Sequence, residues 1–309
     1  MIVFPFSNYE YFLAACGVPE IAERGLFEIG RFENGELFAG VTTPVGLAHC
    51  LIVGSIAPPD DQLLSVALLA HTLKKEGTQK VTAVLPYLGY SRQDKSKAGK
   101  SLATAWVGSV LQASGIHEVV TIDVHSERDK QLFPIPLVSL FPERIFAGAI
   151  TEHQLADAMV VAPDHGAVWR CQAVNNATGR RGADVPYFEK QRQEKGITHV
   201  GPIGKVGPRV VIIDDMLDTG GTLLSACEKL VQAGTQEIYI MVTHGLFTGA
   251  DWKRLWGLGV QRVFCSDTIP PRREIVDDPR ITVLSIVHLL GELLARSLNH
   301  AALSPRDAA

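Results

Sequence analysis

Short runs of apolar, often β-branched residues alternate along the chain with longer segments whose apolar residues recur every three or four positions. The runs predict strands and the longer segments predict helices. We expect strands at Met1–Phe6, Cys50–Ile56, Val81–Tyr87, Val119–His125, Met159–Pro163, Arg209–Asp214, Ile238–Thr243 and Arg262–Ser266, and helices at Asp61–Glu76, Ser101–Ala113, Thr222–Ala233 and Ser285–Leu298. This alternation is typical of an α/β fold with mostly parallel sheets flanked by helices.

Two segments of the chain resemble each other. Gly115–Val119 and Gly234–Ile238 both read Gly, two variable residues, Glu, then Val or Ile, and both lead to a histidine, His125 or His244. A predicted helix precedes each copy, and a strand that runs into a polar loop precedes each helix. The repeat favours two related α/β domains. The alternative is one common αβ fragment that recurs by chance.

A cluster of prolines, Pro134, Pro136 and Pro142, indicates where the two domains meet. Proline punctuates regular structure, so we place the boundary within residues 141–148. We therefore expect an N-terminal domain over residues 1–145 and a C-terminal domain over residues 146–309. Packing of the last helix against the N-terminal domain is compatible with this division.

The amino-acid composition and net charge indicate which broad class of protein this is. The 309 residues are 46% hydrophobic and 20% charged, which is typical of a globular protein, and the formal net charge of −4 argues against a general nucleic-acid binder. The apolar runs are too short to span a membrane. The five cysteines contain no Cys-x-x-Cys pair, and no charged leader precedes the first strand. We expect a cytoplasmic protein whose cysteines are packing residues.

The segment from Asp214 to Thr222 carries the strongest chemical signal. A buried strand leads into two adjacent acids, and a small-residue turn then opens a helix. Backbone N–H groups in such a turn bind an anion without a lysine, and no Walker motif occurs in the chain. Carboxylates accept hydrogen bonds from sugar hydroxyls or bind a divalent metal. The segment predicts a sugar-phosphate site made of Asp214, Asp215, Asp218, Thr219, Gly220, Gly221 and Thr222. A strand-end acid pair followed by an ordinary helix cap is the structural alternative.

The same segment is similar to the phosphoribosyl diphosphate loop of phosphoribosyltransferases and of ribose-phosphate diphosphokinases. Further segments resemble the diphosphokinases in the order of that family: Arg31–Glu36, Pro86–Lys95, Asp123–His125, Ala162–Asp164 and Thr268–Pro270. The resemblance extends from Met1 to about Leu298. It implies two phosphoribosyltransferase-like domains, with ATP on the N-terminal side and ribose 5-phosphate on the C-terminal side.

The resemblance also implies functional roles for residues that the sequence pattern by itself assigns only to a turn or a loop. The Asn34-Gly35 pair predicts a tight hairpin turn, and a loop follows the strand that ends at Tyr87. The family implies that both segments contact ATP, the turn reaching the nucleotide of a neighbouring subunit. The implied ATP-binding residues are Phe32, Asn34, Glu36, Arg92, Gln93 and Asp94.

Two further pairs of residues acquire roles in this way. His125 and Asp164 match the family's Mg²⁺ positions, although a strand-end histidine is more often structural, and imidazole is not the ligand that magnesium prefers. Lys190 and Arg192 match its catalytic flexible loop. They begin a polar, glycine-containing stretch that reaches Pro208 and is typical of a mobile flap or a solvated linker.

The implied activity is transfer of the diphosphoryl group of Mg·ATP to the anomeric hydroxyl of ribose 5-phosphate, which supplies nucleotide biosynthesis. The family also implies a dimer-based homo-oligomer, up to a hexamer, without a nucleic-acid or membrane partner. Two alternatives remain: a phosphoribosyltransferase that consumes phosphoribosyl diphosphate, and an inactive regulatory homologue. The bulky His165 and Trp169, and the charged segment at 126–133, depart from the family pattern.

Overall fold

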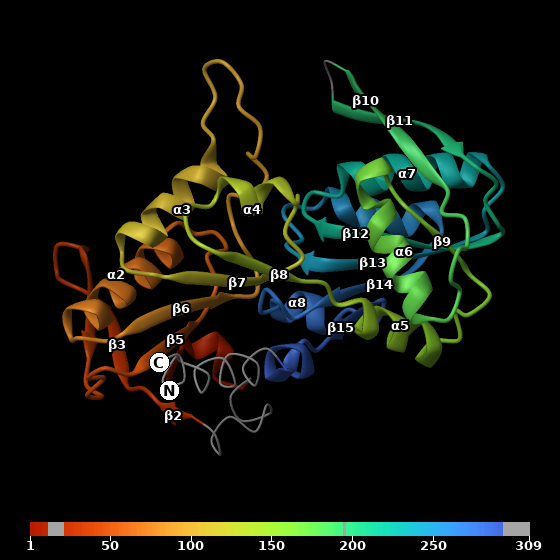
Figure 1. The fold of residues 1–309 in the computed structure, drawn as a ribbon. Coiled ribbons are helices and arrows are strands. Elements are labelled where there is room, and N and C mark those ends of the chain that lie inside the picture. The colour runs from red at the N-terminus through yellow and green to blue at the C-terminus, as the bar shows by residue number, and fades with distance from the viewer. Residues whose placement is uncertain (12–21, 194–195, 293–309) are drawn as a thin grey trace, which may run out of the picture. The chain divides into compact units, whose positions relative to one another are not determined.

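The computed structural model describes residues 1–11, 22–193 and 196–292, and the chain divides into two compact units (Figure 1). Unit 1 comprises Met1–Leu140 together with the described residues from Val287 onward. Unit 2 comprises Phe141–Ile286. Each unit contains its own mostly buried sheet and its own hydrophobic core. No helix in the described parts of the chain is long and apolar enough to cross a membrane.

Unit 1 is built on a six-stranded parallel sheet in the order β2-β1-β5-β6-β7-β8. Its strands are β1 (Ile2–Pro5), β2 (Glu23–Arg24), β5 (His49–Val53), β6 (Lys80–Leu85), β7 (Glu118–Ile122) and β8 (Leu137–Leu140). Its helices are α2 (Asp61–Lys75), α3 (Ala103–Ala113), α4 (Arg128–Leu132) and the 3-10 turn η1 (Ser7–Tyr9). The antiparallel hairpin β3 (Phe27–Arg31) and β4 (Leu37–Val41) packs against α2.

The helix α2 shows how the periodicity produces packing. Leu63, Val66, Leu69, Ala70 and Leu73 recur at helical spacing and are all buried in the unit 1 core. One stripe of the helix therefore faces the sheet, as an amphipathic helix requires. Burial of this stripe fixes α2 over the strands and leaves the carboxyl ends of the strands accessible to loops.

Unit 2 is built on a five-stranded parallel sheet in the order β15-β14-β13-β12-β9. Its strands are β9 (Met159–Val161), β12 (Arg209–Leu217), β13 (Glu237–Gly245), β14 (Val260–Ser266) and β15 (Ile281–Leu284). Its helices are α5 (Glu143–Glu152), α6 (Val168–Ala177), α7 (Gly221–Gln232) and α8 (Arg273–Val276), with the 3-10 segments η3 (His165–Ala167) and η4 (Asp251–Leu258).

The central strand β12 is buried on both faces. Val210 and Ile212 belong to the cluster that contains α7, whereas Val211 and Ile213 belong to the cluster that contains α5 and α6. Successive residues of a strand point to opposite faces, so a continuous apolar run is what a sheet covered on both sides requires. Helices on both faces leave the carboxyl edge of the sheet as the place for polar residues.

The two copies of the sequence repeat occupy matching places. Gly115 ends α3 with a φ of 96° before β7, and Gly234 ends α7 with a φ of 93° before β13. Glycine adopts this left-handed conformation without strain, which explains the residue type at both helix ends. The histidines differ, because His244 lies within β13, whereas His125 lies beyond the end of β7.

The polar stretch after residue 187 forms an antiparallel hairpin of β10 (Tyr187–Gln193) and β11 (Gly196–Ile203) (Figure 1). The sequence predicts a mobile flap or a solvated linker here, and the structure describes the segment as two paired strands. The two strands pair their backbones with each other, and Phe188 of β10 is buried in the unit 2 core.

Other element boundaries also differ from the sequence expectations. β12 continues three residues beyond Asp214, and α3 begins at Ala103 rather than Ser101. Val231, an apolar residue within α7, is 46% exposed. The last predicted helix is helical from Val287 to residue 292, and the remainder lies outside the described residues.

Candidate active site

The turn between β12 and α7 has the backbone geometry of an anion site. Gly220 has a φ of 91° and immediately precedes the first residue of α7, and its carbonyl accepts the N–H of Leu224 at 2.8 Å. Thr219 and Gly221 are exposed on either side of the buried Gly220. The first N–H groups of a helix lack intrahelical acceptors and carry a partial positive charge. The turn therefore presents backbone donors to a phosphate group.

The chain after β13 holds this turn in place. Leu246 donates its backbone N–H to the carbonyl of Leu217 at 2.9 Å, and Thr248 donates to the carbonyl of Asp218 at 3.1 Å. Between them, the carbonyl of Phe247 accepts a hydrogen bond from Nη2 of Arg272 at 2.7 Å. These bonds connect the start of the turn to the rigid sheet, so the donors are fixed before a ligand arrives.

Two buried carboxylates lie just before the turn. Asp214 and Asp215 are 8% and 5% exposed, and Oδ1 of Asp214 accepts the backbone N–H of Asp215 at 3.0 Å. Both are inside β12, because the strand extends to Leu217. Their placement on the central strand gives them the rigid support that a loop would not supply.

Asp164 joins this group from the neighbouring strand. It follows β9, which pairs in parallel with β12, and its Oδ1 accepts the N–H of Ala167 at 3.1 Å. Burial, followed by the charges of Asp214 and Asp164, raises the pKa of the Cys171 thiol, while Arg170 acts in the opposite direction. Both carboxylates therefore lie within electrostatic reach of one buried sulfur at the carboxyl edge of the unit 2 sheet.

The bulky residues that follow Asp164 pack locally. The ring of Trp169 lies 4.9 Å from that of Phe141, and the guanidinium carbon of Arg170 lies 4.7 Å from the centre of the Trp169 ring. The ring of His165 lies 5.3 Å from that of Tyr187, at the start of β10. Trp169 is thus accommodated by an aromatic neighbour in its own unit.

A polar network that sequence reasoning left without a function adjoins these carboxylates on the next two strands. His244 is 2% exposed, and its Nδ1 lies 2.9 Å from Oγ1 of Thr268. Oγ of Ser266 donates to the carbonyl of Thr243 at 2.6 Å. The sequence signal that could have revealed this network was the presence of polar residues at the ends of two adjacent predicted strands. The network satisfies polar groups beneath the site and makes this edge rigid.

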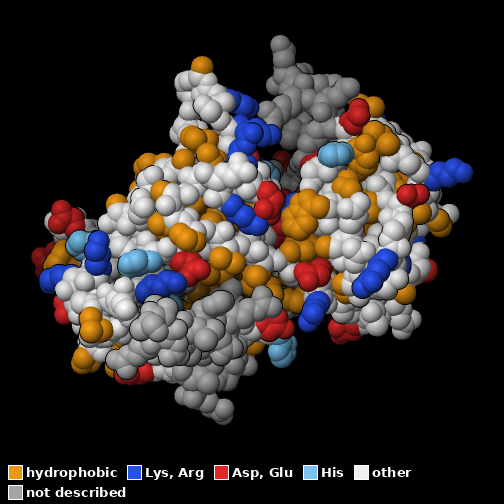
Figure 2. Space-filling model, in the orientation of Figure 1, with side chains coloured by type: hydrophobic (Ala, Val, Ile, Leu, Met, Phe, Trp, Pro, Cys, Tyr) orange, Lys and Arg blue, Asp and Glu red, His pale blue; other side chains and the backbone are white. Residues whose placement is uncertain are grey.

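The second group of candidates lies in unit 1, at the carboxyl edge of its sheet. The loop with Arg92, Gln93 and Asp94 follows β6, and His125 follows the adjacent parallel strand β7. Oε1 of Gln93 accepts a hydrogen bond from Ser101, and Asp94 is 7% exposed. Figure 2 shows Lys and Arg side chains gathered along this protruding loop. The structure thus places a cationic loop and an exposed imidazole at one sheet edge.

Tyr90 anchors the base of this loop, and sequence reasoning missed it. Its hydroxyl donates a hydrogen bond to Asp60, and its ring lies 5.9 Å from that of Trp106 on α3. Burial, together with the neighbouring Asp60 carboxylate, raises the pKa of Tyr90 to about 12. Its φ of 66° is uncommon for a bulky residue.

The hairpin turn forms as predicted, although away from the cationic loop. Gly35 has a φ of 89°, its N–H donates to the carbonyl of Phe32 at 2.8 Å, and the N–H of Glu36 donates to Oδ1 of Asn34 at 3.1 Å. The Phe32 side chain is 57% exposed. Within unit 1, the hairpin and the loop after β6 project from separate places (Figure 1).

The structure describes the backbone of Lys190 and Arg192. Both lie in β10, where they pair with His199 and Ile197 of β11. Tyr187 at the start of β10 forms a parallel bridge with Ala162, two residues before Asp164. The hairpin is therefore connected to the chain segment that carries Asp164.

The metal candidates do not form a preassembled cluster. Within the described ranges, no three His, Cys, Asp or Glu side chains form a group that is able to hold a metal ion. His125 belongs to unit 1 and Asp164 to unit 2. Asp164, Asp214 and Asp215 nevertheless provide the oxygen donors that Mg²⁺ prefers, and Mg²⁺ typically takes one or two carboxylates together with substrate phosphates and water.

Both units match families of known proteins. Residues 21–115 match the N-terminal domain of ribose phosphate pyrophosphokinase, and residues 157–305 match the phosphoribosyl synthetase-associated domain. Pyrophosphokinase and diphosphokinase are two names for the same activity.

Whole-chain comparisons agree. The chain is 30% identical to the ribose-phosphate pyrophosphokinase of Vibrio cholerae over 94% of its length and 96% of that protein, and 28% identical to ribose-phosphate pyrophosphokinase A of Dictyostelium discoideum over 91% and 89%. A crystal structure of phosphoribosylpyrophosphate synthetase from Mycobacterium smegmatis superimposes with a TM-score of 0.83 at 25% identity, covering 97% of this chain and 99% of the other. The chain belongs to the ribose-phosphate pyrophosphokinase family.

Proposed function

We propose that this protein transfers the diphosphoryl group of Mg·ATP to the anomeric hydroxyl of ribose 5-phosphate, producing phosphoribosyl diphosphate and AMP. Family membership supports the reaction. The observation in the structure that carries the proposal is the turn at Gly220, where backbone donors at the start of α7 adjoin the buried Asp214 and Asp215. One sugar phosphate satisfies both features, because its phosphate accepts hydrogen bonds and its hydroxyls donate them.

In this proposal the phosphate of ribose 5-phosphate binds the backbone of Asp218–Thr222. The hydroxyls of the ribose donate to Asp214 and Asp215. As carboxylates, Asp214 and Asp215 accept these hydrogen bonds through their side-chain oxygens. The C-terminal domain, which we place at residues 146–309, is thus the ribose side of the enzyme.

The N-terminal domain, residues 1–145, is the ATP side of the enzyme in this proposal. Arg92 supplies a fixed cation to the triphosphate. Gln93 and Asp94, in the same loop, position the triphosphate. The location of Arg92 at the carboxyl edge of a parallel sheet supports this role, since ligands of open α/β sheets bind at that edge.

Magnesium fits the oxygen donors of unit 2 and is less suited to His125. In our proposal Asp164 holds the ion on the sugar side, and His125 contributes on the ATP side. The ion supplies charge neutralisation and orients the phosphate oxygens. The residues of the chain hold both substrates in line, and positioning with charge stabilisation accounts for most of the catalysis of such transfers.

Lys190 and Arg192 are proposed to stabilise the negative charge that develops on the transferring group. They occupy alternate positions of β10. A hairpin is able to move as a unit while its two strands remain paired, so we propose that the hairpin β10–β11 closes over the substrates.

We further propose a homo-oligomer in which the turn at Phe32, Asn34 and Glu36 contacts ATP bound to a neighbouring subunit. The separation of this turn from the loop after β6 supports such a role. We also propose a cytoplasmic location, consistent with the buried free thiols Cys50, Cys171, Cys227 and Cys265. Light scattering of the purified protein tests the assembly.

The decisive experiment incubates the full chain with ATP, ribose 5-phosphate and MgCl₂ and follows AMP by chromatography and phosphoribosyl diphosphate by ³¹P NMR. We expect both products in equal amounts, and none without the sugar phosphate. Asp215→Asn serves as the matched negative control. Release of ADP or inorganic phosphate in place of AMP contradicts diphosphoryl transfer, and the absence of any product contradicts the enzyme proposal.

A further inference from the structure

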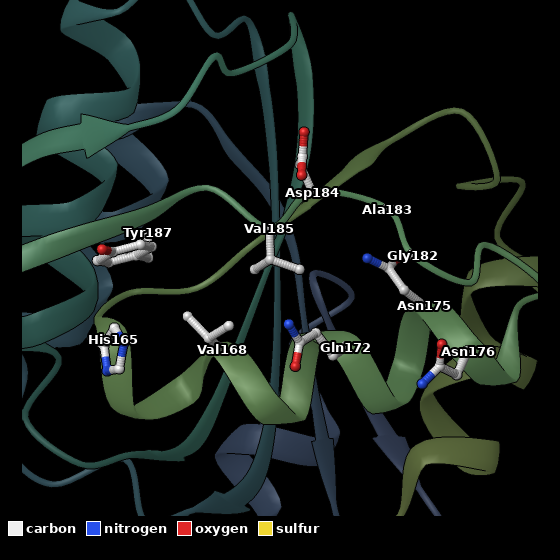
Figure 3. Close-up of a pocket in the computed structure, with 10 residues that line it drawn as sticks. All are labelled: His165, Val168, Gln172, Asn175, Asn176, Gly182, Ala183, Asp184, Val185 and Tyr187. Carbon is white, nitrogen blue, oxygen red and sulfur yellow. The ribbon is translucent and has the colours of Figure 1, made fainter.

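A pocket in unit 2 lies beside the candidate active site and has no role in the proposed reaction. It has a volume of about 480 Å³ and lies between one face of α6 and the extended segment that leads from residue 182 to β10 (Figure 3). Val168, Gln172, Asn175 and Asn176 face it from α6. Their spacing of four, three and one residues places them on a single helical face.

The pocket changes in character along its length. At one end lie the rings of His165 and Tyr187, whose centres are 5.3 Å apart. Figure 3 shows Val168 and Val185 facing one another across the middle, and the amide of Gln172 directed into the space beside them. A flat ligand thus meets aromatic and apolar surface at one end and an amide at the other.

Asn175 provides an independent sign that a polar ligand binds here. The residue is 4% exposed, and its Oδ1 is buried and has no hydrogen-bond partner in the described part of the chain. In Figure 3 its side chain extends from α6 toward the segment at Gly182. A buried acceptor without a partner loses its hydrogen bonds to water, so native proteins rarely retain one without a reason. Figure 3 shows the amide nitrogen of Asn175 on the side of the pocket, where it is suited to a hydrogen-bond acceptor of a ligand.

The charge of the lining excludes some ligand classes. The residues that line the pocket include one carboxylate, that of Asp184, and no Lys or Arg. A phosphate group would meet a carboxylate without a cation to balance it. The chemistry instead favours an uncharged, planar molecule with adjacent N–H donors and acceptors.

From these contacts we infer that the pocket binds an unphosphorylated purine base or nucleoside. Asn and Gln amides pair with the N6 and N7 atoms of adenine, and apolar and aromatic side chains enclose the faces of a base. The volume is sufficient for a nucleoside. The site is distinct from both proposed substrate sites and does not depend on the proposed activity.

The location gives such a ligand a means of affecting the hairpin. Tyr187 is the first residue of β10, and the carbonyl of Pro186 accepts the N–H of Ala162 at 2.9 Å. His165 directly follows Asp164. A base enclosed here contacts the start of the hairpin and the turn after Asp164, so its binding reduces the motion of both.

Calorimetric titration of adenosine into the full chain tests the inference, with the ATP site saturated by a non-hydrolysable ATP analogue and MgCl₂. We expect adenosine to bind under these conditions and AMP to bind at least several-fold more weakly. Gln172→Ala should weaken adenosine about 3- to 10-fold, the effect of one lost hydrogen bond. Gln172→Trp should abolish binding by filling the space. Gln112→Ala, an exposed glutamine on α3, is the matched control and should bind as the unmodified chain does.

A second variant separates binding from folding. Asn175→Leu removes the unpaired acceptor, so we expect an unchanged or higher melting temperature together with weaker adenosine binding. The inference is overturned if adenosine and guanosine both fail to bind at millimolar concentration, or if the ATP analogue displaces them. Equal affinity in the unmodified chain and in both Gln172 variants also overturns it, whatever the stability of Asn175→Leu.

Discussion

The backbone of Trp252 lies directly against Gly220, at the turn that begins α7. A Cβ atom built on Gly220 would lie 2.9 Å from the Cα of Trp252, and the φ of Gly220 is 91°. Trp252 is 2% exposed and is held by the rings of Phe247 and Trp256, at 4.9 and 6.2 Å. The turn therefore has no room for a side chain on this side, and its conformation is set by a residue 32 positions away in sequence.

Gly220→Ala should damage the ribose 5-phosphate site. The substitution combines a left-handed backbone, which costs about 1–2 kcal/mol for a non-glycine residue, with a clash against backbone atoms that cannot rotate away. We expect kcat/KM for ribose 5-phosphate to fall at least 100-fold, while the affinity for ATP changes little. Steady-state kinetics with each substrate varied in turn measures this. Gly257→Ala, where an added Cβ meets open space, is the control and should retain activity.

Two substitutions in different units should separate the substrates. Arg92→Ala removes a cation from the ATP side and should raise KM for ATP about tenfold with little change for ribose 5-phosphate. Asp215→Asn, in a side chain that is 5% exposed, should prevent measurable ribose 5-phosphate binding and leave ATP binding intact. Calorimetry with each ligand alone checks both. If Arg92→Ala weakened the sugar phosphate instead, the assignment of sides would be wrong. Arg128→Ala, on α4, is the matched arginine control.

Lys190→Ala should act on the chemical step. Loss of one donor that stabilises developing charge typically reduces kcat by about 10²–10³-fold. We expect that reduction with unchanged affinities for ATP and ribose 5-phosphate, measured by rapid-quench kinetics and calorimetry. Gln191→Ala provides a control at the neighbouring position of the same strand. Equal rates for the unmodified chain and Lys190→Ala would contradict the role that we propose for the hairpin.

The stability of unit 1 should depend on pH through His49. Burial, followed by the charge of Lys80, lowers the pKa of His49 from 6.5 to about 4. Between these values the unfolded chain binds a proton that the folded chain does not. The contribution of His49 to the free energy of unfolding is therefore complete above pH 6.5 and falls as the pH decreases toward 4.

His49→Gln should reduce this dependence. The imidazole Nε2 lies 3.0 Å from Oγ1 of Thr82, a contact that an amide is able to replace. We expect the melting temperature of the variant to fall less steeply than that of the unmodified chain between pH 6.5 and 4.5, as followed by circular dichroism. His71→Gln, at an exposed position of α2, should keep the original slope. Parallel slopes for His49→Gln and the unmodified chain would show that His49 is not responsible.

Local pattern was sufficient to predict much of this protein. The periodicity of α2 and α7, and the apolar runs of β12 and β13, depend on residues adjacent in sequence, so the fold class follows from the chain alone. The resemblance of short motifs to a known family supplied the rest. The Asp-Asp pair and the glycine turn after it were equally visible, because an anion turn at the start of a helix is a local structure.

The tertiary structure decided what depends on contacts between distant residues. The hairpin β10–β11 depends on pairing between its two strands and on the burial of Phe188 among residues from distant parts of unit 2. The packing of Trp252 behind Gly220, and the pocket beneath Asn175, join segments that are not adjacent in sequence. Sequence determines such features only through the complete fold, because a contact between distant residues leaves no period or spacing along the chain.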